Sequence, residues 1–366
     1  MQTESTVRSS RDPRAVAARF KQTLSLKRSS ALYLGLGFVI VFGYLQPSTF
    51  LTETTFRLVA TEGVIIAVLA LAFLVPLAAN QFDLAIGATM SLSLVTVNWI
   101  AANTDLPAVV GVIAALGACG LVGIVSGFLV VRWRVNSFIA TLGVGQIITA
   151  LVLLISDNRQ ITGAFSASYL ELGRGSFAGV PYIVIYLLVL AGILWFVLEH
   201  TPVGRSIFAT GGNPEAARLA GVRTDGFIVG SLITSSVIAG LAGVLFSMKV
   251  GTFSTSVGPG LLFPAVAAVF LGASQFSQRP NVWGTLVAYF ALALGIKGLQ
   301  LQAGPGGFWI RPLFEGVALV AAVAIASRQA SVRLGWRSRR KAESGESHEG
   351  PAEALAPDEG VVASRT

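Results

Sequence analysis

Long apolar runs separated by short polar segments recur along most of this chain. An α-helix needs about 20 apolar residues to cross the hydrocarbon core of a bilayer. Runs near that length predict about ten membrane-spanning helices, at residues 31–47, 59–79, 84–101, 107–131, 136–156, 180–199, 226–248, 261–275, 281–301 and 310–327. The first and eighth runs are short, which leaves a tilted or re-entrant helix open at those positions. The pattern predicts an all-α membrane protein.

One polar loop interrupts this pattern with helix signals of its own. Residues 211–221, within the 200–225 loop, read GGNPEAARLAG. Asn213 is a favoured N-cap, Pro214 fits the first helical position, and Gly221 can adopt the left-handed conformation that ends a helix. Isolated helices shorter than about 12–15 residues are marginal in water. The loop is therefore predicted to contain a short helix that another surface must hold.

Two interpretations of this short helix remain open on its residues alone. At helical spacing, Ala216, Leu219 and Ala220 share one side, and Glu215 and Arg218 share another. An apolar side of this kind fits a groove in a partner protein. The same helix would also serve as a connector that lies on its own membrane domain.

The composition agrees with lipid as the main solvent. Of the 366 residues, 54% are hydrophobic and only 12% are charged, whereas soluble domains carry about 25% charged residues. The net charge of +8 does not indicate nucleic-acid binding, because the basic residues fall between apolar spans and not along an aromatic-studded face. Cys119, the single cysteine, lies in an apolar run without a partner for a disulfide or a metal site. We therefore expect an integral membrane protein with no metal centre.

Basic residues predict which side of the membrane each loop faces, because Lys and Arg are retained on the cytoplasmic side. With ten spans and a cytoplasmic N-terminus, most of the 26 Lys and Arg residues fall in inner segments, which include the basic segment 1–30 and the 200–225 loop. The N-terminal apolar run lacks a cleavage pattern, so it is predicted to be an uncleaved span. The tail 328–366 is mostly polar and rich in Ala, Pro and Gly, so it is predicted to be disordered. Both termini are thus expected in the cytoplasm.

Several stretches resemble one family of membrane proteins. GRSIFATGGNPEAARLAGV is similar to the cytoplasmic coupling segment of permease subunits of ribose-type ABC sugar importers. QFDLAIGATMSL resembles the junction between the second and third spans of that family, NSFIATLG the start of its fifth span, and FPAVAAVFLGASQF and NVWGTLVAYF its eighth and ninth spans. The resemblance covers roughly residues 31–327, which is the predicted transmembrane permease domain.

This resemblance implies a function and a set of partners. The chain would be a multi-pass permease of the bacterial cytoplasmic membrane that moves a sugar, expected to be a monosaccharide, inward by alternating access. Its partners would be a cytoplasmic ABC ATPase, an extracytoplasmic sugar-binding protein and a second permease copy in a homodimer. The chain has no Gly-Lys pair and so no Walker A loop. ATP and Mg²⁺ are accordingly expected on the ATPase, and this chain is expected to be neither an enzyme nor a cofactor carrier.

Two sets of site residues follow. The resemblance assigns ATPase coupling to Asn213, Pro214, Glu215, Ala216, Ala217, Arg218, Leu219 and Gly221. Polar residues in or beside the spans are candidates for the translocation pathway: Asn80, Asp83, Ser93, Asn98 and Gln146. The same polar groups also serve as interhelical hydrogen-bond partners in other membrane proteins, and Asp83 stands where the third predicted span would want a capping acceptor. Both roles remain open.

Charged residues inside spans are rare and need an explanation. Arg311 and Glu315 are one helical turn apart, and Lys297 lies near the outer end of the preceding span. We expect a structural cluster at the outer rim in which Lys297 pairs with Glu315, with a substrate site as the alternative.

Other functions are less well supported by the sequence. A branched-chain amino-acid or nucleoside ABC permease is the nearest alternative. A secondary transporter would be expected to carry carboxylates deep in the membrane, whereas Glu62 and Glu315 both lie near span ends. A membrane metalloenzyme is disfavoured because there is no HExxH motif and the two histidines, His200 and His348, lie at a span end and in the tail.

Overall fold

The computed structural model describes residues 30–273, 279–321 and 324, and most of these residues are helical. The helices are α2 (Ser30–Leu45), α3 (Pro47–Phe50), α4 (Glu53–Ala78), α5 (Ile86–Asn103), α6 (Ala108–Arg132), α7 (Ser137–Ser156), α8 (Ala167–Arg174), α9 (Tyr182–His200), α10 (Pro202–Gly212), α11 (Pro214–Leu219), α12 (Thr224–Val250), α13 (Val257–Ala273) and α14 (Val282–Ala303), after which come a 3-10 turn, η2 (Gly304–Trp309), and the helical residues 310–321. The basic segment before residue 30 and the predicted tail 328–366 lie outside the described residues.

Four two-residue strands complete the described structure. β1 (Ile161–Thr162) pairs antiparallel with β4 (Thr252–Phe253), which follows α12 directly. β2 (Ser176–Phe177) and β3 (Val180–Pro181) form a small hairpin between α8 and α9. These strands therefore join loops at the helix ends and do not build a sheet through the core.

Each predicted span coincides with a helix over the residues that the structure describes, and the ends of the spans 261–275 and 310–327 lie outside them. By length and composition, six helices in the described part are able to cross a membrane: Glu53–Ala78, Ala108–Arg132, Ser137–Ser156, Tyr182–His200, Thr224–Val250 and the continuous segment Val282–Ala321. The apolar helices Ala31–Leu45 and Val257–Ala273 are shorter, as the length of their apolar runs predicted. The mostly helical membrane protein is confirmed, and the count of ten crossings stays a prediction.

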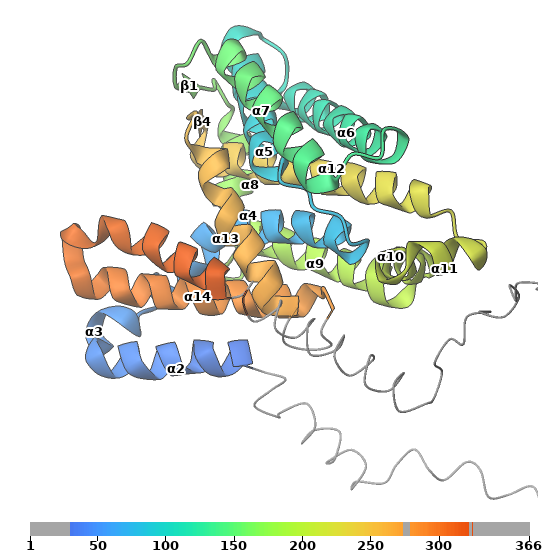
Figure 1. The fold of residues 1–366 in the computed structure, drawn as a ribbon. Coiled ribbons are helices and arrows are strands. Elements are labelled where there is room, and N and C mark those ends of the chain that lie inside the picture. The colour runs from blue at the N-terminus through green and yellow to red at the C-terminus, as the bar shows by residue number, and fades with distance from the viewer. Residues whose placement is uncertain (1–29, 274–278, 322–323, 325–366) are drawn as a thin grey trace, which may run out of the picture. The chain divides into compact units, whose positions relative to one another are not determined.

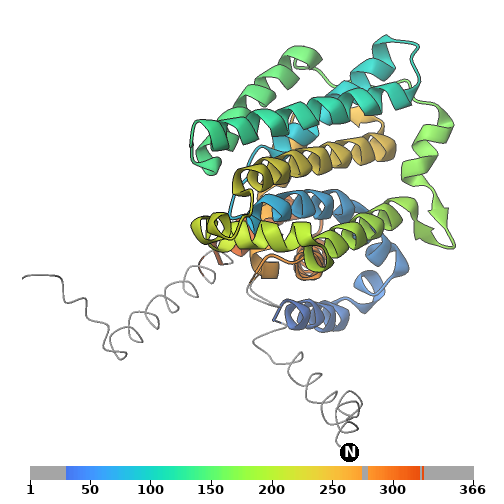
Figure 2. The same ribbon diagram turned by 90° about the vertical axis from the view of Figure 1, so that its right-hand side faces the viewer.

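Helix α4 lies at the centre of the helix stack. Its residues 64–75 are at most 3% exposed, and they pack against α9, α12, α13 and α14. A helix that is apolar on every side is stable where other helices surround it. Figure 1 shows α4, α5 and α12 between α6 and α7 on one side and α2 and α14 on the other, and Figure 2 shows the same layers from the side.

The helices around this centre expose apolar side chains outward. Ile113 of α6, Leu154 of α7 and Phe196 of α9 are each more than half exposed. In water such surfaces would be costly, whereas in lipid they are the expected outer face. The outward faces of α6, α7 and α9 are thus suited to the hydrocarbon core.

Small residues allow the central helices to approach closely. A Cβ on Gly123 of α6 would lie 2.5 Å from the Cα of Ile233 in α12, and one on Gly243 of α12 would lie 2.5 Å from the carbonyl oxygen of Met90 in α5. Glycine is common at such crossings in membranes, because it brings two backbones together. At these two positions the backbone of α12 therefore lies directly against the backbones of α5 and α6.

Candidate functional site

The predicted coupling helix exists and is capped at both ends. Asn213 ends α10 and begins α11, and its Oδ1 accepts a hydrogen bond from the backbone N–H of Ala216 at 3.0 Å. At the other end Gly221 has φ +83°, and its N–H donates to the Arg218 carbonyl while the next N–H, of Val222, donates to the Ala217 carbonyl. This is a Schellman motif. The helix ends at Leu219, and Ala220, with φ −80° and ψ 9°, is its C-cap.

The two sides of α11 differ in what they touch. Ala217 is 6% exposed and packs on the chain's own helices, whereas Leu219 is 91% exposed. Ala216 and Ala220, which share a side with Leu219, are exposed as well. The chain therefore holds this helix by one small residue and leaves its larger apolar side uncovered.

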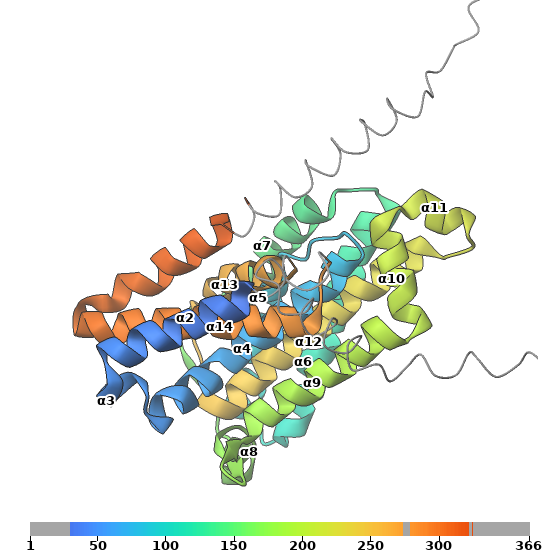
Figure 3. The ribbon, with the colours of Figure 1, turned by 90° about the horizontal axis from the view of Figure 1, so that it is seen from below.

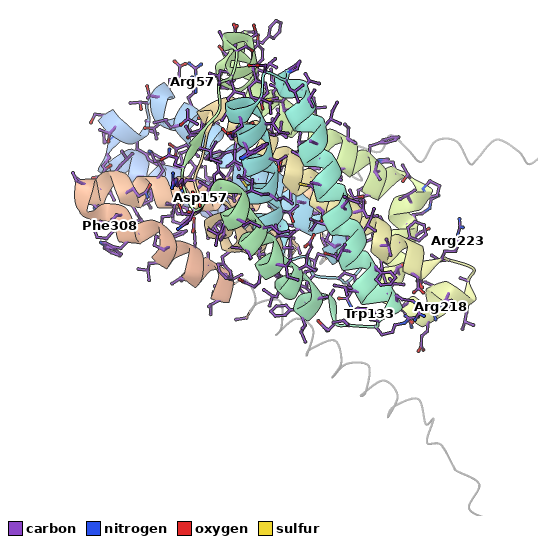
Figure 4. The ribbon with its side chains drawn as sticks, turned by 90° about the horizontal axis from the view of Figure 1, so that it is seen from above. Arg57, Trp133, Asp157, Arg218, Arg223 and Phe308 are labelled. Carbon is purple, nitrogen blue, oxygen red and sulfur yellow. The ribbon has the colours of Figure 1, made fainter. Side chains whose placement is uncertain are left out.

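A cluster of three charges lies beside α11. Asp225, in the first turn of α12, is 3.4 Å from Arg218 of α11 and 3.6 Å from Arg134 of the α6–α7 loop. Each pair is half exposed, so each contributes about 0–1 kcal/mol. A shallow groove of about 740 Å³ lies beside the cluster, lined by residue 218 and residues 221–227. Figure 4 shows Trp133, Arg218 and Arg223 at the same end of the helices.

Helix α10 joins this coupling segment to the buried helix α4. A methyl group on Gly211 would overlap the carbonyl oxygen of Ala78, the last residue of α4, and would lie 3.0 Å from the backbone nitrogen of Asn80. Asn80 itself has φ +56°. The segment between α4 and α5 thus begins directly against Gly211 of α10, three residues before the start of α11.

The segment between α4 and α5 is held on its other side by α7. The N–H of Phe82 donates to Ser137 Oγ and that of Leu84 donates to Thr141 Oγ1, both at 3.0 Å. Thr141 also donates to the Phe82 carbonyl at 3.2 Å. These bonds satisfy backbone groups outside the helices that would otherwise be unpaired. We name residues 79–85 the α4–α5 junction.

Asp83 is fully buried at the middle of this junction. Its Oδ1 accepts from the N–H of Ala85 at 3.1 Å, and Ser235 of α12 faces its carboxylate. Helix α5 begins at Ile86 with Ala85 as the N-cap. The expected capping role is therefore corrected: Asp83 forms a turn with the residue two positions on, just before the helix starts.

The structure does not gather the five predicted pathway residues into one place. Ser93 donates to the Gly240 carbonyl of α12 at 2.7 Å, and Asn98 Nδ2 donates to the Leu94 carbonyl at 2.9 Å. Asp83, Ser93 and Asn98 are buried around α5, whereas Asn80 and Gln146 are exposed. Ser93 thus bonds from α5 to α12, whereas the bond of Asn98 lies within α5 itself.

Further buried hydroxyl groups, beyond the candidates named from the sequence, lie on α5 and on its neighbours α6 and α12. The hydroxyls of Ser126 in α6 and of Ser235 and Ser236 in α12 are buried. Thr89 and Ser91 contribute further buried hydroxyls from α5 itself. The stretch SLITSSVIAG indicated polar positions in this span, but their direction depends on how α12 is turned.

The charged residues Arg311, Glu315 and Lys297 pair differently from the prediction. Glu315 lies 3.8 Å from Arg311, one turn earlier on the same helix, and within the described residues Lys297 has no ionic partner within 4.0 Å. The close ion pair expected between Lys297 and Glu315 is therefore not formed, and Glu315 instead pairs with its neighbour on the same helix. Lys249, at the end of α12, donates to the carbonyl oxygen of Thr61 in α4 at 3.0 Å.

Comparison with known proteins gives the family. A family model described as branched-chain amino acid transport system / permease component matches residues 56–324. This chain belongs to that family of permeases. The permease is 31% identical over 296 residues to the fructose import permease protein FrcC of Rhizobium meliloti, covering 78% of this chain and 81% of the relative. It is 29% identical over 292 residues to the D-allose transport system permease protein AlsC of Escherichia coli (strain K12), covering 78% and 87%.

A third relative is the ribose import permease protein RbsC of Bacillus subtilis (strain 168), 28% identical over 294 residues, with 80% of this permease and 90% of the relative covered. No solved structure matches the permease. Family membership and the six long apolar helices make it a multi-pass protein of the cytoplasmic membrane. The matched region contains both the coupling segment and the α4–α5 junction.

Proposed function

We propose that this permease is the membrane subunit of an ABC importer that moves a sugar, a monosaccharide in the simplest case, into the cytoplasm. The observation that carries the proposal is helix α11, capped by Asn213 and Gly221 and presenting an uncovered Leu219. A short rigid helix with a free apolar side is suited to a groove in a partner protein. The substrate class rests on relatives named for the import of fructose, D-allose, ribose and L-arabinose.

The proposed partner of α11 is a cytoplasmic ATPase subunit that binds ATP and Mg²⁺. The residues proposed to couple it are those from Asn213 to Leu219 together with Gly221. Closure of the ATPase would push α11, and α10 would pass the movement to the α4–α5 junction through the contact of Gly211 with Ala78. Alternating access would follow from movement of that junction against α7.

The proposed orientation has ten crossings, with both termini in the cytoplasm. The position of the basic residues supports this orientation. Arg134 and Arg218 lie at the same end of the helices as Arg279. Arg279 forms an ion pair of 2.6 Å with Glu199 and lies over the ring of Phe208 in α10. Basic loops are retained in the cytoplasm, so this end is proposed to be the inner one. The proposed division of the chain is a basic segment 1–30, a permease domain 31–327 and a tail 328–366.

A sugar-binding protein outside the membrane and a second permease copy complete the proposed importer. Gln146 is an exposed amide on the otherwise apolar outer face of α7, a costly group to leave against lipid. A homodimer with α7 near its interface would cover this amide and form the pathway between two chains. Asn80 and Gln146 would then face the pathway, whereas Asp83, Ser93 and Asn98 would support the helices that line it.

The test is reconstitution in proteoliposomes. The permease, the ATPase and the binding protein encoded beside it are assembled, and uptake of labelled ribose, fructose, allose, arabinose and leucine is measured with and without ATP. We expect uptake of one sugar that requires ATP and all three proteins. Leucine uptake would favour the branched-chain amino-acid alternative, which the family description supports. Uptake by the permease alone, driven by an ion gradient, would contradict the proposal.

A further inference from the structure

Helix α12 connects the two ends of the permease without a break. It runs from Thr224 to Val250, 27 residues with no proline, which corresponds to about 40 Å at 1.5 Å per residue. Its first turn adjoins α11, and its last turn adjoins the short helix α8. Figure 3 shows α8 and α11 at opposite ends of the helix stack.

The connection at the first end is ionic. Arg218 of α11 reaches Asp225 and also donates to Thr224 Oγ1, both at 3.4 Å. Arg134 reaches the same carboxylate from the α6–α7 loop. Helix α11 is thus linked to the first turn of α12 by Arg218 and by the short chain segment 220–223.

The connection at the last end is made by three residues of α8, which we name the α8 clamp: Tyr169, Gly173 and Arg174. The hydroxyls of Tyr169 and Ser247 share a hydrogen bond of 2.6 Å. Arg174 donates through Nε to the Lys249 carbonyl at 2.8 Å and through Nη2 to the Val250 carbonyl at 3.1 Å. These carbonyls end the helix and have no partner within it, and a cationic donor is favoured there.

Gly173 brings the backbone of α8 onto that of α12. A methyl group at this position would overlap the carbonyl carbon of Met248 and lie 2.6 Å from the nitrogen of Lys249. The strand pair β1–β4 and the bond from Gly163 N–H to the Gly251 carbonyl, at 3.1 Å, join the loop before α8 to the same end. The last turn of α12 is thus joined to α8 and the loop before it by side-chain hydrogen bonds, by backbone hydrogen bonds and by the close approach of the two backbones at Gly173.

Between its ends α12 has little freedom to bend. It packs on α4, α5 and α6, and the contacts of Gly243 with Met90 and of Gly123 with Ile233 leave no space at the crossings. Packed cores shift between discrete arrangements and do not deform gradually. A push on one end of α12 is therefore felt at the other.

We infer that α12 is a rigid rod linking α11 to α8, and that the α8 clamp lets contact with an extracytoplasmic protein at α8 alter the position of α11. The inference rests on the proposed function for the identity of the two partners. Tyr169, Gly173 and Arg174 are positioning residues in this scheme, since they act on the ATPase only through α12. The linkage is mechanical and involves no substrate contact.

The first test uses the permease alone. Spin labels are attached at Ser168 of α8 and Leu219 of α11, both exposed, in a Cys119→Ala background. We expect one narrow distance distribution in the parent protein and a distribution at least twice as broad in Arg174→Ala. The control Arg57→Ala, which removes an exposed arginine near the start of α4, is expected to keep the narrow distribution. Equal widths in Arg174→Ala and the parent would overturn the clamp.

The second test uses the complete importer and separates the rod from the proposed function. ATP hydrolysis is measured with and without the binding protein for Tyr169→Phe, Arg174→Ala, Arg174→Lys and the control Gly230→Ala, a site on α12 where an added Cβ meets nothing within 4 Å. We expect the stimulation of ATP hydrolysis by the binding protein to fall at least fivefold in Arg174→Ala and by a smaller factor in Tyr169→Phe. Arg174→Lys is expected to recover part of the stimulation, and the control Gly230→Ala is expected to keep it. Basal hydrolysis and ATPase association are expected to stay within twofold of wild type.

The outcomes point in different directions. If the wild-type importer shows no ATPase association, the proposed function fails. If association and stimulation occur in wild type and every clamp variant keeps full stimulation, the rod is refuted and the proposed function stands. Loss of association together with stimulation in Tyr169→Phe would also refute the rod, because it would show that α8 only supports folding.

Discussion

Gly211 and Gly212 are neighbours on α10, yet an added methyl group is predicted to act on them differently. At Gly211 it would overlap the Ala78 carbonyl and lie 3.0 Å from the backbone of Ala79 and Asn80, whereas at Gly212 it meets nothing within 4 Å. Overpacking of this kind costs about 1–3 kcal/mol. Alanine is favoured over glycine in a helix by about 1 kcal/mol, and that gain applies to both positions. The difference between the two variants therefore isolates the overlap, at about 1–3 kcal/mol.

This difference is measurable without any partner protein. A cost of about 1–3 kcal/mol shifts an equilibrium by on the order of 5–150-fold. We expect backbone amides of the α4–α5 junction, residues 79–85, to exchange hydrogen faster by about this factor in Gly211→Ala than in Gly212→Ala. Exchange in α2, which packs on α14, is the internal control and is expected to be the same in both.

In the assembled importer the same pair of variants tests transmission. Gly211→Ala is expected to lower sugar uptake per ATP hydrolysed, while Gly212→Ala keeps the wild-type ratio. Equal junction exchange in the two variants would show that α10 does not press on the junction. Faster exchange in Gly211→Ala with normal uptake would show that the contact exists but does not carry the movement.

Three further predictions follow from the charges and caps. Cysteine at Ser176 should react with a membrane-impermeant reagent in intact cells and cysteine at Gly212 should not; the opposite labelling would invert the orientation. Gly221→Val places a β-branched residue at φ +83°, a costly geometry, and should abolish uptake while the protein still inserts; wild-type uptake and ATPase binding would make α11 a simple connector. Arg311→Gln removes the ionic partner of Glu315, and because Arg311 is 42% exposed the cost is about 1 kcal/mol. Its unfolding temperature should still fall further than that of Lys297→Gln. Equal temperatures would show that Glu315 is held by other groups.

Local features of the permease could be predicted because they depend on residues close together in the chain. The cap at Asn213, the proline after it and the left-handed Gly221 involve hydrogen bonds that span three to five residues. The apolar runs similarly required helices, since a backbone in lipid must satisfy its own hydrogen bonds. The spacing of Arg311 and Glu315, one helical turn apart, was equally visible in the sequence. The sequence did not show that Glu315 would pair with Arg311 and not with Lys297.

The arrangement of these helices was decided by tertiary structure. Gly211 contacts Ala78, Lys249 reaches Thr61, and Arg174 reaches the end of α12 across 75 residues of chain. Such contacts depend on how each helix is turned about its axis, and in a membrane nearly every face is apolar, so the hydrophobic pattern gives little information on that rotation. The chain sequence determined which segments are helices and how α11 is capped; only the packing of α4, α5 and α12 decided which polar groups face one another and which end of α12 meets α8.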